Sequence, residues 1–159
     1  MRMPVHAARG ILFFLWELPQ NLLGLAVWGV VRKRVLSRET EGGRIFLRVP
    51  DFGLSLGSFI FWSMTDPAAV SKPSERTDNR LHELGHAVQS RRLGPLYLLL
   101  VGVPSVSRFL YARSYKRKRG EPWTRYFDGY PENWADRLAE KSGRNGGNPE
   151  NPNEDKANA

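Results

Sequence analysis

The run His82-Glu83-Leu84-Gly85-His86 constrains the fold of this chain more than any other stretch. On an α-helix, residues four apart lie on one face, about 6 Å apart along the axis. Two imidazoles at that spacing can bind one divalent metal ion, and the neighbouring Glu83 can accept a proton from a water molecule at the metal. The run therefore predicts a helix with a metal-binding face.

The local sequence favours a helix within residues 77–95. Thr77 and Asp78 can cap its start, and acidic Asp78 suits the positive end of the helix dipole. Gly94-Pro95 is a typical helix end. Apolar side chains at helical spacing predict the face that packs against the rest of the protein, namely Leu81, Leu84 and Val88.

A catalytic zinc site needs a third protein ligand and an open position for water. The chain has three histidines and no cysteine, and the third histidine, His6, lies in the N-terminal tail, so we expect a carboxylate. The best candidate is Glu132, because Pro131 before it suits the first position of a helix. Asp136 follows one turn later and can accept a hydrogen bond from a ligating histidine. Alternatively, both carboxylates form a solvated face near a helix start.

The motifs HELGH and ENWADRLA together resemble those of the glutamate-zincin metallopeptidases. They look most like the membrane-associated family of the CAAX prenyl protease and heat-shock protease X type, whose second motif reads ExxxD. The stretch 82–105 also looks like a group of small, uncharacterised bacterial membrane proteins. The resemblance implies a Zn²⁺ ion bound by His82, His86 and Glu132, with Glu83 as general base and Asp136 supporting a ligand.

Two apolar segments and a net charge of +8 predict contact with an anionic membrane. Segment 11–31 is long enough to span a bilayer, but Glu17 and Pro19 interrupt it. We expect a kinked membrane helix or a shallow hairpin there, with residues 1–34 as the anchor. The alternative is a helix buried in a soluble core.

The second apolar segment, 96–111, precedes a run of basic residues. Because positive clusters follow both apolar segments, both exits should face the cytoplasm. We therefore expect 96–111 to be re-entrant or interfacial, with the metal site on the cytoplasmic side. The basic run suits anionic lipid, and because no recognised nucleic-acid motif accompanies it, we expect no nucleic acid to bind. It consists of Arg113, Lys116, Arg117, Lys118 and Arg119.

The expected fold class is α+β: a mainly helical, zincin-like minimal domain over residues 35–141, with a short β-hairpin and a membrane-facing side. Residues 32–43 read as a basic linker, and 44–49 and 54–62 as the two strands of the hairpin. These strands either hold an extended substrate or simply cover the metal-binding helix. The Gly-, Asn- and Pro-rich tail, 142–159, reads as disordered.

These features predict a membrane-associated zinc metallopeptidase that hydrolyses a peptide or protein substrate, with Glu83 as general base. No histidine follows His86 to stabilise the oxyanion, so Tyr126 or Tyr130 is the candidate donor. Two alternatives stay open. The metal could have a purely structural role, or the chain could be a metal-free, basic membrane-binding protein.

Overall fold

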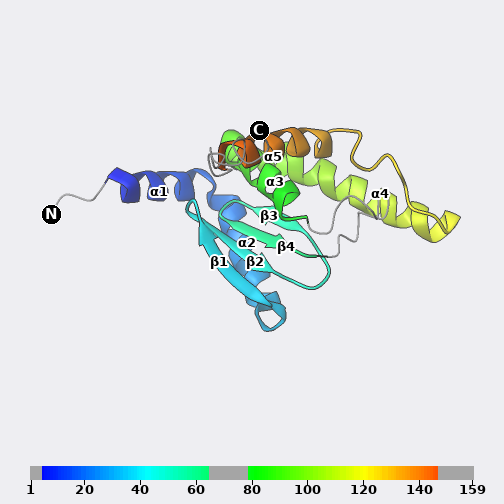
Figure 1. Cartoon of the computed structure of the whole chain (residues 1–159), viewed down its shortest axis with the longest axis horizontal. Helices are drawn as coiled ribbons and strands as arrows, with labels where there is room; N and C mark the ends of the chain where they lie inside the picture. Colours follow the sequence, from blue (N-terminus) through cyan, green and yellow to red (C-terminus); the bar gives the residue numbers. More distant parts are fainter. Residues whose placement is uncertain (1–4, 65–78, 147–159) are drawn as a thin grey trace, which may run out of the picture.

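The structure is a computed structural model that describes residues 5–64 and 79–146. Within these ranges the chain is a mixed α+β fold, as predicted (Figure 1). The helices are α1 (Val5–Trp16), α2 (Leu18–Val31), α3 (Arg80–Leu93), α4 (Val103–Arg119) and α5 (Glu132–Gly146). The strands are β1 (Ser37–Glu41), β2 (Arg44–Arg48), β3 (Leu54–Leu56) and β4 (Phe59–Trp62).

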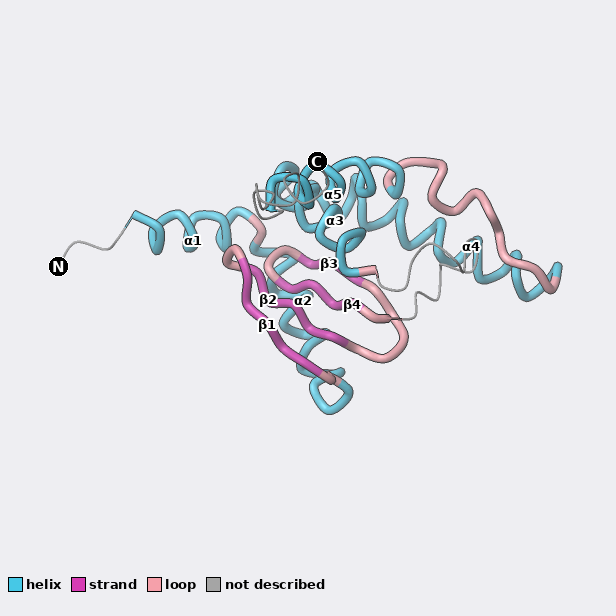
Figure 2. Tube along the Cα trace, in the orientation of Figure 1, coloured by secondary structure: helices cyan, strands magenta, loops and turns pink. Residues whose placement is uncertain are grey.

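The four strands form one mixed sheet in the order β1-β2-β4-β3 (Figure 2). β1 pairs with β2 and β3 with β4, each as a tight antiparallel hairpin, while β2 and β4 are parallel. Gly42 and Gly43 take φ angles of 57° and 74° in the first turn, and Gly57 takes 61° in the second. These are left-handed conformations that glycine adopts at little cost.

This topology corrects two predictions. The expected linker over 32–43 contains strand β1, and the expected hairpin between 44–49 and 54–62 does not form. Instead, the second stretch folds back on itself at Gly57. As a result β3 becomes an edge strand and β4 pairs in parallel with β2.

The two faces of the sheet are covered by different helices. Alternate residues of a strand point to opposite faces, and here both sets are apolar. On one face Leu47, Phe59 and Phe61 pack against α2 through Val27, Trp28 and Val31. On the other face Phe46, Ile60 and Trp62 pack against Ala87 of α3. α5 lies on the far side of α3, so the layers run α2, sheet, α3, α5 (Figure 1).

α1 and α2 meet in a sharp corner at Glu17. Within the described residues no single helix has both the length and the apolarity to cross a bilayer; Gly10–Trp16 and Leu18–Arg34 meet the criterion only together, and they bend by 88°. The corner is fastened to the end of α3, since Trp16 Nε1 donates to Arg91 O at 3.0 Å and Gln20 Nε2 donates to Gly94 O. Glu17 is completely buried, with Oε2 3.8 Å from Arg91 Nε.

The second apolar segment is helical throughout. A short 3₁₀ turn (Gly94–Leu96) and a π-helical turn (Leu98–Gly102) lead directly into α4, which carries the basic run to Arg119. Many of its apolar side chains are exposed, including Leu96, Leu99, Leu100, Val103, Val106 and Leu110. The end of α4 extends away from the body on one side and α1 on the other (Figure 1).

The ends of α3 and α5, the helices that carry the two motifs, differ in detail from the predictions. Thr77 and Asp78 lie outside the described residues, and α3 begins after Asn79. It ends at Gly94 as predicted, with a φ of 53°. α5 begins at Glu132, directly after a cis Tyr130–Pro131 bond, and it continues to Gly146, into the segment that was expected to be disordered.

Candidate metal centre

The buried face of α3 is mostly polar. The predicted apolar stripe is wrong, because Leu81 is exposed and Leu84 and Val88 are only partly buried. The buried positions are instead His82, Glu83, Gly85, His86, Ala87, Gln89 and Ser90. α3 is covered by the sheet on one side and by α5 on the other. The site therefore lies inside the fold rather than on its surface.

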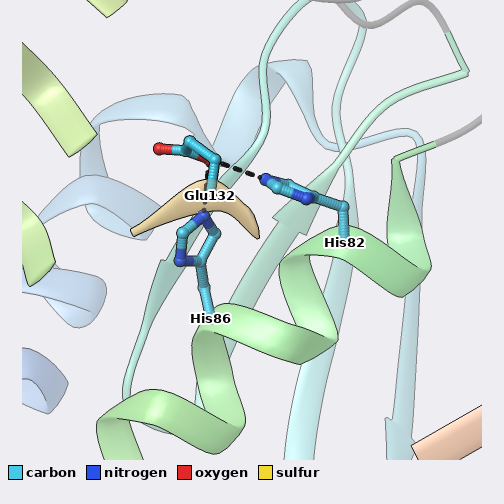
Figure 3. A group of neighbouring side chains, drawn as sticks. All are labelled: His82, His86 and Glu132. Atoms are coloured by element: carbon cyan, nitrogen blue, oxygen red, sulfur yellow. Dashed lines mark hydrogen bonds and ion pairs between the residues drawn. The ribbon is translucent and has the colours of Figure 1, made fainter. Parts of the chain in front are cut away.

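The two histidines project from α3 toward α5, and Glu132 meets them from the first turn of that helix (Figure 3). Glu132 Oε2 lies 3.0 Å from His82 Nε2 and 3.1 Å from His86 Nε2. All three side chains are buried, and one ligand atom from each lies within 4.8 Å of the others. The predicted set of three donors is therefore assembled from residues that are about fifty positions apart.

Gly85 permits this approach of the two helices. A Cβ atom at Gly85 would lie 2.1 Å from the carbonyl oxygen of Ala135 on α5, closer than real Cβ atoms come to any neighbour. Only glycine lets the two backbones pack this tightly. Glu132 lies one turn before Ala135 on the same helix. The spacing of α3 and α5 at Gly85 therefore determines how close the Glu132 carboxylate comes to the two histidines.

Each histidine is held by a hydrogen bond at its other ring nitrogen. Asp136 Oδ1 lies 2.7 Å from His82 Nδ1, as the sequence predicted, and Gln89 Oε1 lies 2.8 Å from His86 Nδ1. The Gln89 amide is oriented in turn, since its Nε2 donates to Pro131 O at 3.0 Å. Both Nδ1 atoms therefore donate, which leaves both Nε2 lone pairs facing the Glu132 carboxylate.

Three acceptor atoms that converge in a buried space need a cation or a proton between them. Burial favours the neutral forms of Glu132 and His82, but the hydrogen bonds that these two side chains make outweigh the effect of burial. They hold the pKa of Glu132 well below its usual range, and hydrogen bonds from Asp136 and Glu132 raise the pKa of His82 to about 10. The donor set fits a divalent metal such as zinc, and two histidines with one carboxylate also suit iron or cobalt.

Glu83 is buried beside the donor set, on the side of strand β3. The Ser55 hydroxyl donates to Glu83 Oε2 at 2.9 Å and lies 2.5 Å from the Glu83 carbonyl oxygen. Burial raises the pKa of Glu83, although the two histidines and Ser55 act in the opposite direction. A raised pKa makes the carboxylate a stronger base once it is ionised.

A cavity of about 640 Å³ opens beside the donor set. His82, Glu83, His86 and Glu132 line it together with edge strand β3 and the first half of α4. Its other walls are largely apolar and include Leu23, Phe52, Leu54, Leu56, Val106 and Phe109. Because Val106 and Leu23 are also about half exposed, the cavity is continuous with the apolar surface of α4 and α2.

The two tyrosines proposed as oxyanion donors differ in position. Tyr126 is buried and lines the cavity. Tyr130 is about half exposed, is not among the lining residues, and donates its hydroxyl hydrogen to Leu100 O at 2.6 Å. The structure therefore brings Tyr126 to the site but not Tyr130.

Several residues that shape the site were missed from the sequence. Gln89 follows His86 by three positions, so helical spacing could have identified it as a neighbour. Ser55 and Ser105 come from distant elements; the Ser105 hydroxyl donates to Glu132 Oε1 at 2.6 Å. No local pattern marks a single serine as a partner of a residue so far along the chain.

No protein-family model, no curated protein and no solved structure matches this chain. The likeness to glutamate-zincins therefore depends on the two motifs alone.

Proposed function

We propose that this chain is a zinc-dependent peptide hydrolase that works at an anionic membrane surface. The observation that carries the proposal is the convergence of His82 Nε2, His86 Nε2 and Glu132 Oε2 at the wall of an apolar cavity that also contains Glu83. Three protein ligands leave room for water or substrate in the fourth position of a tetrahedral metal.

The chemistry is divided among the residues of the site. When bound, Zn²⁺ supplies a Lewis acid that polarises a carbonyl group and lowers the pKa of water to about 7. Glu83 accepts the proton of the attacking water and delivers it to the leaving amine. Ser55 orients the Glu83 carboxylate through its hydrogen bond. Tyr126 is the candidate donor to the oxyanion, because it lines the same cavity.

The walls of the cavity favour a peptide with apolar side chains. Edge strand β3 lines the cavity, and a strand edge can pair with an extended peptide backbone. Leu54 and Leu56 on β3 and Phe109 on α4 then offer apolar contacts to the substrate side chains. Among the described residues that line the cavity, the acidic side chains are those of Glu83 and Glu132, and no lysine or arginine is present.

The membrane part of the proposal is supported by exposed apolar side chains on α1, α2 and α4. The surface of a soluble protein rarely carries so many large apolar side chains in neighbouring helical turns. They include Leu12, Leu15, Leu22, Leu25, Val103 and Leu110. The exposed cations at the end of α4 suit anionic headgroups, and we propose that residues 1–34 and 96–111 lie at the cytoplasmic leaflet.

The test is to purify the protein in detergent, measure bound zinc and then measure peptide hydrolysis. Glu83→Gln should keep stoichiometric zinc and lose on the order of 10²- to 10⁴-fold in rate, because general base catalysis contributes about that much. Glu121→Gln is the matched control, since Glu121 is exposed in the loop after α4 and should leave the rate unchanged.

Other outcomes would assign other functions. Full activity in Glu83→Gln excludes Glu83 as the base. Stoichiometric zinc in an inactive wild-type protein, with unfolding on metal removal, indicates a structural metal. A protein that binds vesicles but no metal would be a basic membrane-binding module.

A further inference from the structure

We propose that Ser105 is a positioning residue that restricts Glu132 to binding the metal through one oxygen. The two oxygens of the Glu132 carboxylate have different partners: Oε2 faces both histidines, and Oε1 accepts the Ser105 hydroxyl hydrogen at 2.6 Å. The inference rests on the metal site of the proposed function, but not on peptide hydrolysis.

The hydrogen bond from Ser105 matters because Glu132 is completely buried. A carboxylate can bind a metal through one oxygen or through both. While Ser105 donates to Oε1, that oxygen has a partner and only Oε2 is directed at the metal. Without the hydroxyl, the nearest cation available to Oε1 is the metal itself. Binding through both oxygens would then fill the coordination position that water or substrate needs.

Ser105 is held in place by contacts between α4 and the segment that leads to Glu132. In the π-helical turn before α4, Leu100 O accepts a hydrogen bond from the Tyr130 hydroxyl at 2.6 Å. One turn after Ser105, Arg108 donates to Tyr126 O through Nε at 3.1 Å and to Arg125 O through a terminal nitrogen at 2.7 Å. These contacts lie before and after Ser105 in the chain, so its hydroxyl is presented to Glu132 from a fixed position.

Each metal ligand therefore has one outer partner, and the three partners come from three helices. Asp136 on α5 holds His82, Gln89 on α3 holds His86, and Ser105 on α4 holds Glu132. Outer partners of this kind typically change metal affinity or activity by about 10- to 100-fold when removed. Ser105 is the partner contributed by the helix whose outer side carries exposed apolar residues.

The closing experiment compares Ser105→Ala, Ser105→Thr and Ser107→Ala without any substrate. Ser107 lies on the same helix, but its hydroxyl donates to Val103 O at 2.8 Å. Zinc dissociation constants come from competition with a chelator. Ser105→Ala should change the zinc affinity by about 10- to 100-fold, whereas Ser105→Thr, which keeps the hydroxyl, and Ser107→Ala should remain close to wild type.

A second readout reports coordination directly. In the Co²⁺-substituted protein, binding through both carboxylate oxygens raises the coordination number, so the visible absorption bands of Ser105→Ala should weaken, while Ser105→Thr and Ser107→Ala keep the wild-type spectrum. A wild-type spectrum and affinity in Ser105→Ala would overturn the inference. Loss of hydrolysis alone in Ser105→Ala would also overturn it, because that points to contact with substrate. If Ser105→Ala shows the expected changes in zinc affinity and Co²⁺ spectrum but the wild-type protein has no peptidase activity, only the proposed function is overturned.

Discussion

Replacing Gly85 with alanine tests whether the close contact between α3 and α5 builds the metal centre. The added Cβ would lie 2.1 Å from Ala135 O and 2.7 Å from the Ala135 carbonyl carbon. Carbon and oxygen atoms normally approach to about 3.3 Å, so the two helices must separate by roughly 1 Å. Metal–ligand distances tolerate only about 0.2 Å. Because Glu132 moves with α5, its carboxylate should no longer meet the two histidines at a common point.

The expected result has two parts. Overpacking should lower the free energy of unfolding of the metal-free protein by about 1–3 kcal/mol. Zinc affinity should fall by about 100-fold or more, which exceeds the usual effect of losing one outer partner. At a free zinc concentration 100 times the wild-type dissociation constant, zinc stabilises the wild type by about 2.7 kcal/mol, and a variant that binds 100-fold more weakly by about 0.4 kcal/mol.

The assay is thermal or denaturant unfolding with and without zinc, together with chelator competition. Gly29→Ala is the matched control, because Gly29 lies within α2 and a Cβ there meets nothing within 4 Å. That variant should gain about 0.5–1 kcal/mol from better helix propensity, with unchanged zinc affinity. Wild-type zinc affinity in Gly85→Ala would refute the idea that this contact sets the position of Glu132.

Two further predictions concern protons and lipid. Zinc binding should release a proton at neutral pH, because the pKa of His82 is about 10 in the metal-free protein and the metal displaces that proton. Apparent zinc affinity should therefore fall about tenfold for each unit that the pH drops below about 10. The same proton stabilises the metal-free fold below pH 6.5, and this contribution is lost as the pH rises through about 10. Calorimetry in buffers of different ionisation enthalpy measures the release, and identical heats in all buffers would contradict it. Replacing Lys116, Arg117, Lys118 and Arg119 by serine should weaken binding to anionic vesicles by on the order of 10³-fold at low salt, at about 1 kcal/mol per charge. Substituting the exposed Arg137 and Lys141 on α5 by serine is the control for loss of positive charge elsewhere and should have a much smaller effect per charge removed. An unchanged affinity of the fourfold variant would argue against the α4 cluster as the lipid contact.

The geometry of the candidate metal centre was the most predictable part of this protein. Helix periodicity alone places His82 and His86 on one face, and the ExxxD spacing places Asp136 one turn after Glu132. The structure brings all four together. The contributions of Ser55 and Ser105 could not be predicted, because they depend on how distant elements pack around α3.

The sheet was harder to predict than the helices, for identifiable reasons. Strand β1 reads SRETE and is largely exposed, so it has no alternation of apolar and polar residues to reveal it. In contrast, β4 is buried on both faces and gives an unbroken apolar run. The one residue that indicates a turn between β3 and β4 is Gly57, which lies in the middle of what looks like a single strand in the sequence.

The predicted stripe on α3 failed because the helix buries its polar face, which carries the candidate metal ligands. Leu81 lies on the exposed side, while polar residues such as Gln89 and Ser90 are fully buried. A pattern of apolar residues identifies the packed face only where burial serves packing alone. Here burial also brings together the candidate metal ligands.

The packing of α2 has a practical consequence for recombinant work. A truncation at residue 34, the obvious way to obtain a more soluble protein, would remove Trp28 and Val31 from the core and uncover Phe59. It would also take away the Asn21 side chain, which accepts a hydrogen bond from the Ser58 amide at 2.7 Å in the β3–β4 turn. The shortened polypeptide would expose the hydrophobic face of its own sheet and aggregate, so expression trials should keep the N-terminal helices.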